Sequence, residues 1–426
     1  MSSVLGISLP DEWSTAPLKH ITTYLNRGSA PTYVDDGAVR VISQAANQAT
    51  GLDWTRTRFH EFSGDPKKLK GFLRADDVLV NSTGTGTLGR VGYFTQAPDG
   101  LPCMADGHVT VARAKSGELD SRFMYYWLGS RPFQEFVYAA LVVGATNQIE
   151  LNRDRLGDAP VPLPPLEEQR RIADLLDAET ARIDQLLRLR KRQIVLTEER
   201  SGSALDAAFN GSSHVPTRLK YLLAVKSRYG VLVPQFVDEG VRFVRVNDLL
   251  DLPGRAASLV KIPAELSAQY ARTVTKAGDV LLSVVGTMGR SAVVPEELAG
   301  ANVARAVASL RPRSDVPSWL IATWLTTPAF LRQANDVTGS DTAQPTLGME
   351  DLGNFQLSWP TDKRGLEALG QAVSRIEQQR NALTQLLRRQ TVLLAERRQA
   401  LIIAAVTGQF DVSTASGRNV TKGITV

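Results

Sequence analysis

Two long segments without proline constrain the fold of this chain of 426 residues more than any other feature. The first follows a proline-rich stretch at 160–165 and extends from Glu167 to Phe209. Its apolar residues recur every three to four positions with charged residues between them, the pattern of an amphipathic helix. Such a helix would be roughly 60 Å long, too long for the core of one small domain. The pattern therefore predicts a second long helix as its partner.

The second segment lies between Pro360 and Ala405. Its apolar residues fall at alternating spacings of three and four, which predicts the seam of a coiled coil. These residues are Leu366, Leu369, Val373, Ile376, Leu383, Leu387, Leu394 and Leu401. The two segments also end alike, because residues 199–211 resemble 396–408 and each stretch closes on a glycine suited to a helix C-cap. We interpret the chain as an internal duplication.

The regions that precede the two helices repeat as well. Residues 75–90 and 277–290 each contain an Asp-Val-Leu strand followed by a Gly-Thr-x-Gly-Arg turn. The framework agrees between the copies, whereas the segments between its parts differ in length and chemistry. This pattern is typical of one scaffold that carries two different specificities.

The predicted fold is α+β, with two similar domains that are each followed by a long helix. The helices are expected to pair as an antiparallel coiled coil, so the chain is a pseudo-two-fold internal repeat. The expected boundaries are 1–160 and 213–358 for the domains, 161–212 and 359–412 for the helices, and 413–426 for a tail.

Composition narrows the classes of function. A net charge of +5 permits binding to a polyanion without requiring it. Cys103 is the sole cysteine, which excludes an intrachain disulfide and suits the cytoplasm. We expect neither a signal peptide nor a membrane span, because the sequence has no apolar run of the needed length.

The glycine-rich loop at 83–90 imitates two nucleotide-binding motifs. Gly84, Gly86 and Gly89 match the spacing of a dinucleotide-binding loop, and Gly84 with Gly89 also matches a P-loop. However, Arg90 stands where a P-loop needs lysine, and the residues after it predict a strand where a dinucleotide loop must open a helix. We therefore expect a tight strand-to-strand turn, with a nucleotide-dependent enzyme as an alternative.

The order of domain, proline-led helix, domain and helix resembles the specificity subunits of type I restriction-modification enzymes. The resemblance covers nearly the whole chain and rests on residues 162–177, 183–187 and 401–409, and on the repeated strands and turns. It implies two target-recognition domains that each read one half of a split site in double-stranded DNA. It further implies that the helix pair separates these domains and docks two methyltransferase subunits. Whether restriction or translocase subunits also join the complex is left open. Residues 358–364 lack the proline-rich and Glu-Glu-Gln pattern, so the contacts at the start of the second helix are expected to differ.

The sequence gives no support for a catalytic function. The chain lacks the Asn-Pro-Pro-Tyr and Asp-Pro-Pro-Tyr motifs of amino-methyltransferases, a P-loop lysine, and histidines at metal-ligand spacing. The acidic pairs Asp76 with Asp77 and Glu167 with Glu168 suit a strand-start turn and a helix N-terminus. The prediction is a non-enzymatic DNA-reading subunit without cofactor or metal, and the alternative is a coiled-coil adaptor that binds only protein.

Side-chain chemistry indicates the candidate DNA contacts, because Arg suits phosphate and guanine while Asn and Gln suit adenine. In the first domain they are Arg56, Arg58, Lys67, Lys68, Ser82, Thr83, Thr85, Arg90, Asn147 and Gln148. In the second domain they are Arg245, Asn247, Thr287, Arg290, Thr342 and Gln344. Arg90 and Arg290 occupy the same framework position in the two copies. For both residues the sequence leaves two roles open, a phosphate contact or an ion pair within the scaffold. Candidates for partner binding lie off the helix seam, and burial against the chain's own domains is the alternative for them. They are Leu187, Val195, Leu196, Val392 and Leu393.

Overall fold

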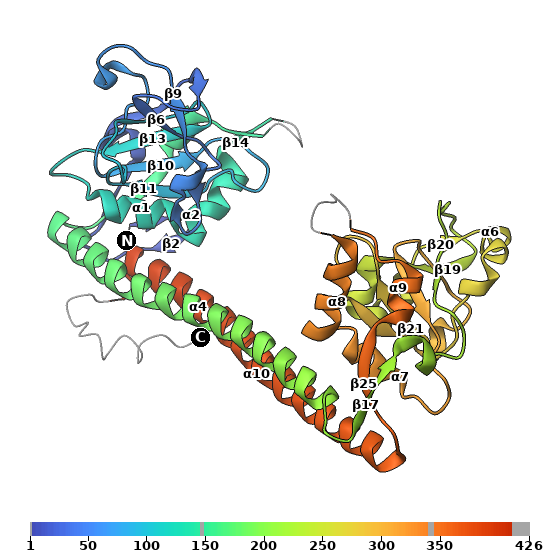
Figure 1. The fold of residues 1–426 in the computed structure, drawn as a ribbon. Coiled ribbons are helices and arrows are strands. Elements are labelled where there is room, and N and C mark those ends of the chain that lie inside the picture. Colours follow the sequence, from blue (N-terminus) through green and yellow to red (C-terminus); the bar gives the residue numbers. More distant parts are fainter. Residues whose placement is uncertain (1, 145–148, 340–344, 411–426) are drawn as a thin grey trace. The chain divides into compact units, whose positions relative to one another are not determined.

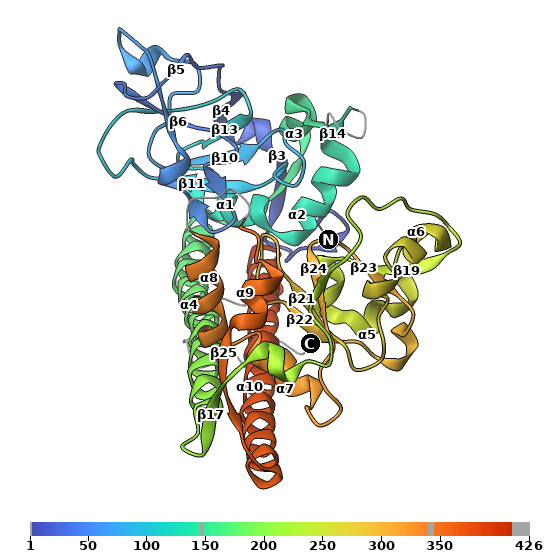
Figure 2. The same ribbon diagram turned by 45° about the vertical axis from the view of Figure 1, so that its right-hand side comes forward.

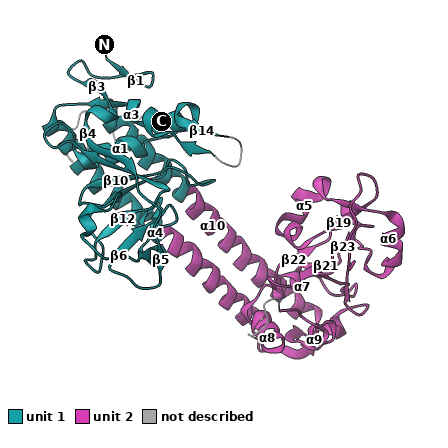
Figure 3. Ribbon diagram, turned by 90° about the horizontal axis from the view of Figure 1, so that it is seen from above, with its two compact units in different colours: residues 1–189, 390–426 teal, residues 190–389 magenta. Residues whose placement is uncertain are grey.

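The computed structural model describes residues 2–144, 149–339 and 345–410. Its contacts divide the chain into two compact units, residues 1–189 with 390–426 and residues 190–389 (Figure 3). Each unit holds one globular domain and part of two helices of 44 residues, α4 (Leu166–Phe209) and α10 (Lys363–Val406). Within the described ranges, no helix has both the length and the apolar character needed to cross a membrane.

The first domain is built on a four-stranded antiparallel sheet in the order β11-β10-β13-β4 (Figure 1). Its strands are β4 (Thr22–Arg27), β10 (Asp77–Asn81), β11 (Val91–Phe94) and β13 (Val109–Ala114). The central strand β10 is buried along its whole length, as its apolar Val-Leu-Val run predicts. In the register of the sheet, Asn81 lies opposite Val109, and Thr110 lies opposite Arg27. The end of β10, the start of β13 and the end of β4 therefore share one end of the sheet.

A second four-stranded sheet, in the order β12-β6-β9-β5, completes the first domain. It consists of β5 (Tyr33–Val34), β6 (Val39–Ile42), β9 (Arg58–His60) and β12 (Cys103–Ala105), with β12 parallel to β6. Shorter elements fill the connections. They are β1 (Ser3–Val4), β2 (Ile7–Ser8), β3 (Ser14–Pro17), η1 (Leu18–His20), β7 (Asn47–Gln48), β8 (Gly51–Leu52), η2 (Trp54–Arg56), η3 (Pro66–Lys68), β14 (Val142–Val143), β15 (Glu150–Leu151) and β16 (Pro160–Leu163).

Helices close the first domain against the long helices of the same unit. They are α1 (Ser121–Gly129), α2 (Arg131–Phe136), the π-helical turn η4 (Val137–Leu141) and α3 (Arg153–Asp158). Phe123 and Trp127 of α1 belong to one buried cluster with Ile172 of α4, Leu401 of α10 and Trp13 of the N-terminal segment. The two ends of the chain thus contribute to one apolar core, and burial of these large side chains is its main stabilising contribution.

The second domain repeats the sheet of the first. Its four-stranded sheet has the order β18-β24-β21-β22, with β18 (Arg228–Tyr229), β21 (Val280–Ser283), β22 (Ser291–Val293) and β24 (Val307–Leu310). Strand β19 (Val241–Val244) pairs in parallel with β23 (Asn302–Val303) and antiparallel with β20 (Lys261–Ile262). Strands β17 (His214–Arg218) and β25 (Gln356–Pro360) pair where the chain enters and leaves the domain (Figure 2).

The remaining elements of the second domain are short helices. They are η5 (Leu219–Leu222), η6 (Val246–Asp251), α5 (Leu252–Arg255), η7 (Ala256–Ser258), α6 (Ala264–Gln269), η8 (Ala271–Thr273), η9 (Glu296–Leu298), α7 (Ser318–Trp324), α8 (Pro328–Thr338) and α9 (Met349–Asn354). Helix α7 occupies the place that α1 has in the first domain, because Trp324 shares a buried cluster with Leu369 and Val373 of α10.

The long helices pair in antiparallel fashion within each unit. In the first unit, Leu176 near the start of α4 shares a core with Leu401 near the end of α10. In the second unit, Leu205 near the end of α4 shares a core with Leu369 near the start of α10. The predicted fold class is confirmed: two similar mixed domains, each followed by a long helix, in a duplicated chain.

One position of the predicted seam is wrong. Leu383 is 45% exposed, whereas its neighbour Thr384 is 6% exposed and Leu387 is 5% exposed. Thr384 therefore takes the seam position at this point, and Leu383 faces away from the seam. Apolar periodicity misplaced the seam because polar residues occupy part of it.

Candidate nucleic-acid interface

Three loops of the first domain meet at one end of its main sheet. They follow Arg27 of β4, follow Asn81 of β10 and precede Val109 of β13. Backbone hydrogen bonds join them, because Gly28 N donates to Val109 O (3.0 Å) and Ser82 N donates to His108 O (2.8 Å). We call this group, residues 28–32, 82–90 and 106–108, the first loop end.

The first loop end carries a polar network around Thr83. The Thr83 hydroxyl lies 3.1 Å from Gln44 Oε1 and 2.8 Å from His108 Nδ1. Because a hydroxyl has one proton, Thr83 donates to the Gln44 oxygen and accepts from the ring nitrogen. Sequence reasoning missed Gln44 and His108, although both lie next to recognisable strands and carry groups that suit base edges.

The glycine-rich loop forms the turn between β10 and β11. Gly84, Gly86 and Gly89 have positive φ angles of 99°, 77° and 80°, which L-residues rarely adopt. A strand follows the turn, as predicted, so it lacks the helix N-terminus that would bind a pyrophosphate. Thr85 and Gly86 are exposed at its tip.

Arg90 lies beside this turn and is held by neutral oxygens. Its guanidinium donates to Asn47 O (3.2 Å) and to Gln48 Oε1 (3.1 Å). These acceptors orient the side chain without cancelling its charge, which leaves a positioned cation at the loop end.

Other candidates of the first domain are placed differently. Ser82 is buried, and its hydroxyl lies 2.5 Å from the Thr110 hydroxyl. Asn147 and Gln148 lie outside the described residues.

The basic stretch belongs to the second sheet and the turns around it. The side chains of Arg56, Arg58, Lys67 and Lys68 are exposed. Arg56 pairs with Asp53 at 3.0 Å, and the Arg58 guanidinium lies 3.9 Å from the centre of the Tyr33 ring. Phe62, an aromatic residue of the same stretch, packs on the core cluster of Val39 and Met104.

The second domain has a corresponding loop end. Strand β18 ends at Tyr229, β21 ends at Ser283 and β24 begins at Val307, and these residues lie at one end of the sheet. Val284 N donates to Ala306 O at 3.0 Å, and Arg305 N donates to Val231 O at 2.9 Å. We call residues 230–237, 284–290 and 304–306 the second loop end.

The candidates of the second domain repeat part of the first arrangement. Arg290 donates to the Asn247 side-chain oxygen at 3.4 Å, as Arg90 does to Gln48, and Thr287 is exposed in the turn. Arg245 instead donates to the buried Asp248 carboxylate at 3.2 Å, which ties it to its own turn. Thr342 and Gln344 lie outside the described residues.

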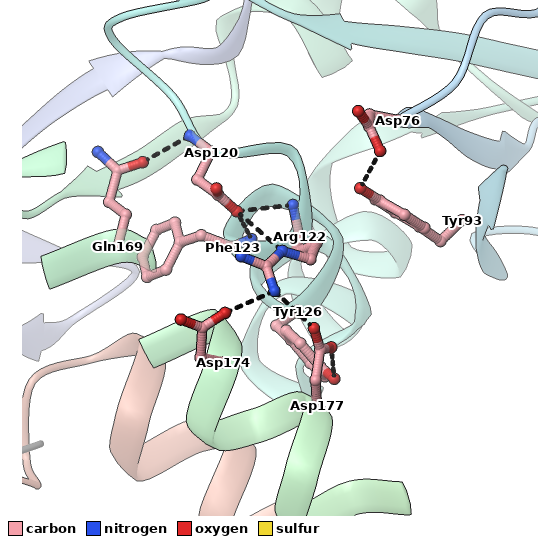
Figure 4. A network of polar contacts seen from close by, with 9 residues as sticks. All are labelled: Asp76, Tyr93, Asp120, Arg122, Phe123, Tyr126, Gln169, Asp174 and Asp177. Atoms are coloured by element: carbon pink, nitrogen blue, oxygen red, sulfur yellow. Dashed lines mark hydrogen bonds and ion pairs between the residues drawn. The ribbon is translucent and has the colours of Figure 1, made fainter. Parts of the chain in front are cut away.

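A polar network ties the first domain to helix α4 (Figure 4). The buried Gln169 side chain accepts from Asp120 N (2.8 Å) and donates to Glu118 O (3.1 Å) and Pro164 O (2.9 Å). Arg122 donates to Asp174 (2.7 Å) and to Asp177 (2.9 Å). This network gives a structural role to the glutamine of the proline-led motif.

Tyr126 extends the same network. Its hydroxyl donates to the Asp177 carboxylate at 2.6 Å (Figure 4). Burial and this hydrogen bond raise the pKa of Tyr126, so the phenol stays protonated at neutral pH.

The acidic pairs noted in the sequence have structural partners. Asp77 is buried and paired with Arg113, whereas Asp76 accepts from the Tyr93 hydroxyl at 2.7 Å. Glu168 accepts from Trp13 Nε1 at 3.2 Å, and Glu167 pairs with Arg170. In the part of the chain that the structure describes, no group of three or more His, Cys, Asp or Glu side chains is arranged to hold a metal ion.

The long helices expose apolar side chains. In the first unit, Leu189, Val392 and Leu393 are exposed, and Leu187 is half-buried. In the second unit, Val195, Leu196, Leu383 and Leu386 are exposed. Sequence reasoning missed Leu189, Leu383 and Leu386.

Comparison with known proteins agrees with this architecture. Residues 10–195 match the family model described as Type I restriction modification DNA specificity domain. The chain is 27% identical over 399 residues to the specificity subunit of the type I restriction enzyme EcoBI from Escherichia coli, which covers 81% of this chain and 80% of that protein. It is 24% identical over 171 residues, 39% of each chain, to the MjaX specificity subunit, itself assigned provisionally, of Methanocaldococcus jannaschii.

Solved structures share the fold. A chain from a study of complex assembly and conformational transition in a type I restriction-modification system matches with a TM-score of 0.70 and 21% identity, covering 95% of this chain and all of that one. The HsdS subunit from Thermoanaerobacter tengcongensis matches with a TM-score of 0.51 and 21% identity, covering 95% and 98%.

The fold and the two loop ends define a class of protein, a duplicated subunit in which each mixed domain is followed by a long helix. Residues 10–195 belong to the type I restriction-modification DNA specificity domains. The predicted resemblance of the chain to type I specificity subunits, and with it the role of a DNA-recognition specificity subunit, is confirmed.

Proposed function

We propose that this specificity subunit reads a split target in double-stranded DNA, with one half-site for each loop end. The observation that carries the proposal is the repetition of one loop framework with different side chains. Arg90 and Arg290 hold the same place, whereas Gln44, Thr83 and His108 surround the first turn and Asn247 and Thr287 surround the second. A common framework with distinct polar groups suits two similar docking geometries that read different bases.

Phosphate and base contacts fall to different residues in this proposal. The exposed cations Arg56, Arg58, Lys67 and Lys68 suit the DNA backbone, because their charges lie on the surface. Thr83, Thr85 and Thr287 lie in the turns and suit base edges. Arg90 and Arg290 are assigned to phosphate, because neutral oxygens hold them in place at both loop ends.

The domains of the proposal are residues 1–160 and 213–358, with helical segments 161–212 and 359–412 between and after them and a tail at 413–426. The exposed apolar residues of the helices would dock methyltransferase subunits, two per chain, because each unit carries its own set. Restriction or translocase subunits would join the same complex. These partners would supply the chemistry, so the chain itself acts without catalysis and without a cofactor, in the cytoplasm.

The experiment that tests the proposal is single-molecule sequencing of methylated adenines in the source genome, with the chain present or deleted. We expect one split, asymmetric motif to lose methylation on deletion, and its two halves would give the two half-sites. Unchanged methylation, with the methyltransferase subunits expressed, would contradict the proposal and favour an adaptor that binds only protein.

Exchange of one domain tests the assignment of half-sites. Replacing residues 213–358 by the corresponding domain of another specificity subunit should change one half of the motif and leave the other. A change in both halves would show that the domains do not read independently.

A further inference from the structure

The loop that follows β18 in the second domain exposes apolar side chains. Leu232 is 55% exposed, Val233 is 76% exposed and Phe236 is 56% exposed. Apolar groups that remain in water at neighbouring positions are costly unless a partner covers them. Sequence reasoning missed these three residues, because their side chains carry no hydrogen-bonding group for a base edge.

The backbone presents Leu232 and Val233 in a fixed way. Val231 is 1% exposed, its N donates to Val303 O at 2.8 Å, and its O accepts from Arg305 N. A Cβ on Gly230 would lie 1.9 Å from Val303 O, so this close approach requires glycine. Because Val231 is anchored on both sides, the two residues after it are held at the surface rather than folded into the core.

The loop belongs to the second loop end. It begins where β18 ends, beside residues 304–306, and Ala306 is joined to Val284 at the start of the glycine turn. Arg305, an exposed cation, lies within this group. The apolar side chains are therefore continuous with the surface proposed to face DNA.

The first domain uses the same backbone framework with different chemistry. A Cβ on Gly28 would lie 1.9 Å from Ala105 O, which matches Gly230. The residues that follow Gly28 are Ser29, Ala30, Pro31 and Thr32, small or polar where the second copy has valine and leucine. Tyr33, the counterpart of Phe236, is held by Arg58. A surface for a partner common to both domains would be alike in both copies, whereas a base-reading loop would differ.

We propose that Leu232 and Val233 determine specificity by contacting thymine methyl groups in the major groove of the second half-site. Thymine is the base whose major-groove edge offers an apolar group, and aliphatic side chains are its natural complement. The neighbouring Arg305 supplies the charge that attracts a phosphate to the same place. The inference rests on the proposed function and names the base class that this domain reads.

The test uses the complete methyltransferase complex assembled on this chain, with duplexes that carry the motif found by methylation sequencing. Each thymine of the second half-site is replaced in turn by uracil, which lacks the 5-methyl group and pairs identically. We expect uracil at one or two positions to weaken binding about threefold to tenfold, the effect of burying one methyl group. The double variant Leu232→Ser with Val233→Ser should bind thymine DNA more weakly and should not distinguish it from uracil DNA.

Matched variants make the result specific. Val225→Ser changes an exposed valine at the opposite end of the sheet, before β18, and should leave both affinities unchanged. Val233→Thr keeps the shape of the side chain and should show part of the loss. Size-exclusion chromatography checks that every variant still assembles with the methyltransferase subunits.

Three outcomes would overturn the inference. They are equal binding of thymine and uracil DNA by the unaltered complex, a second half-site without thymine, and a double variant that no longer assembles because the loop docks protein. A failure of the proposed function is separate, since it would appear earlier as unchanged methylation on deletion of the chain.

Discussion

Arg113 donates from Nε and Nη2 to the two carboxylate oxygens of Asp77, each at 2.7 Å, and Asp77 is fully buried. Arg311 makes the same two contacts with Asp279, again at 2.7 Å. Each aspartate also accepts from a backbone N three residues earlier, Arg74 in one copy and Lys276 in the other. The Asp-Val-Leu repeat is thus the signature of a buried ion pair that joins neighbouring strands.

Removal of the buried carboxylate should destabilise either domain. We expect Asp77→Ala or Asp279→Ala to lower the free energy of unfolding by about 3 kcal/mol, because each leaves an arginine without its partner in a desolvated site. Urea denaturation followed by fluorescence measures the loss. Glu135→Ala breaks an exposed pair with Arg131 and should cost less than about 0.5 kcal/mol. A loss that small for Asp77→Ala would show that the buried pair contributes little.

Gln169→Leu should loosen the attachment of the first domain to α4. The leucine has a similar size but leaves Asp120 N, Glu118 O and Pro164 O without their bonds to the buried amide. We expect a loss of about 2 to 4 kcal/mol, since each buried polar group left unpaired costs about 1 to 3 kcal/mol. Hydrogen exchange should rise at the start of α1 and α4, and exchange confined to distant loops would contradict the role. Gln193→Leu, which changes an exposed glutamine of α4, is the control.

The thiol of Cys103 should be unreactive in the folded protein. Burial raises its pKa to about 12 from an ordinary 9.0, and the side chain is 1% exposed. We expect alkylation by iodoacetamide at pH 8 to follow unfolding of the first domain rather than the fraction of thiolate. Labelling of the folded chain at the rate of a free thiol would contradict this expectation.

The same shift predicts a dependence of stability on pH. The folded state holds the Cys103 proton more tightly than the unfolded state does. The contribution of the protonated thiol to the free energy of unfolding is therefore complete below pH 9 and is lost as the pH rises toward 12. Because other groups also titrate in this range, the measured quantity is the difference in free energy of unfolding between the unaltered chain and the Cys103→Ala variant. That difference should fall by up to about 1.4 kcal/mol for each pH unit above 9, and a difference independent of pH would show that the thiol is not shielded.

Exposed apolar residues of the helices should matter for assembly rather than for folding. We expect Val392→Glu with Leu393→Glu to reduce binding of methyltransferase subunits at least tenfold, because charges would enter an apolar interface. The melting temperature should change little, since both side chains are exposed in the isolated chain. Arg389→Glu, an exposed polar site on α10, controls for added negative charge. Unchanged assembly of the double variant would remove these residues from the proposed interface.

The sequence determined the architecture because its signals are periodic and duplicated. Proline-free segments of 44 residues in α4 and α10 cannot be buried in a small domain, so each requires a helical partner. The repeated Asp-Val-Leu strands and glycine turns predicted that the domain is duplicated, because both features recur at matching positions only when the fold itself is repeated.

The tertiary structure decided which side chains meet and which remain exposed. Apolar spacing placed Leu383 in the seam, whereas packing buries Thr384 instead. Gln44 and His108 are far apart in sequence and meet at Thr83 because strand register brings three loops to one end of a sheet. Residue type indicates which side chains have the chemistry to contact DNA, but long-range strand pairing decides which of them are exposed. For the same reason, only the structure separates buried Val231 from exposed Leu232 and Val233 in one apolar run.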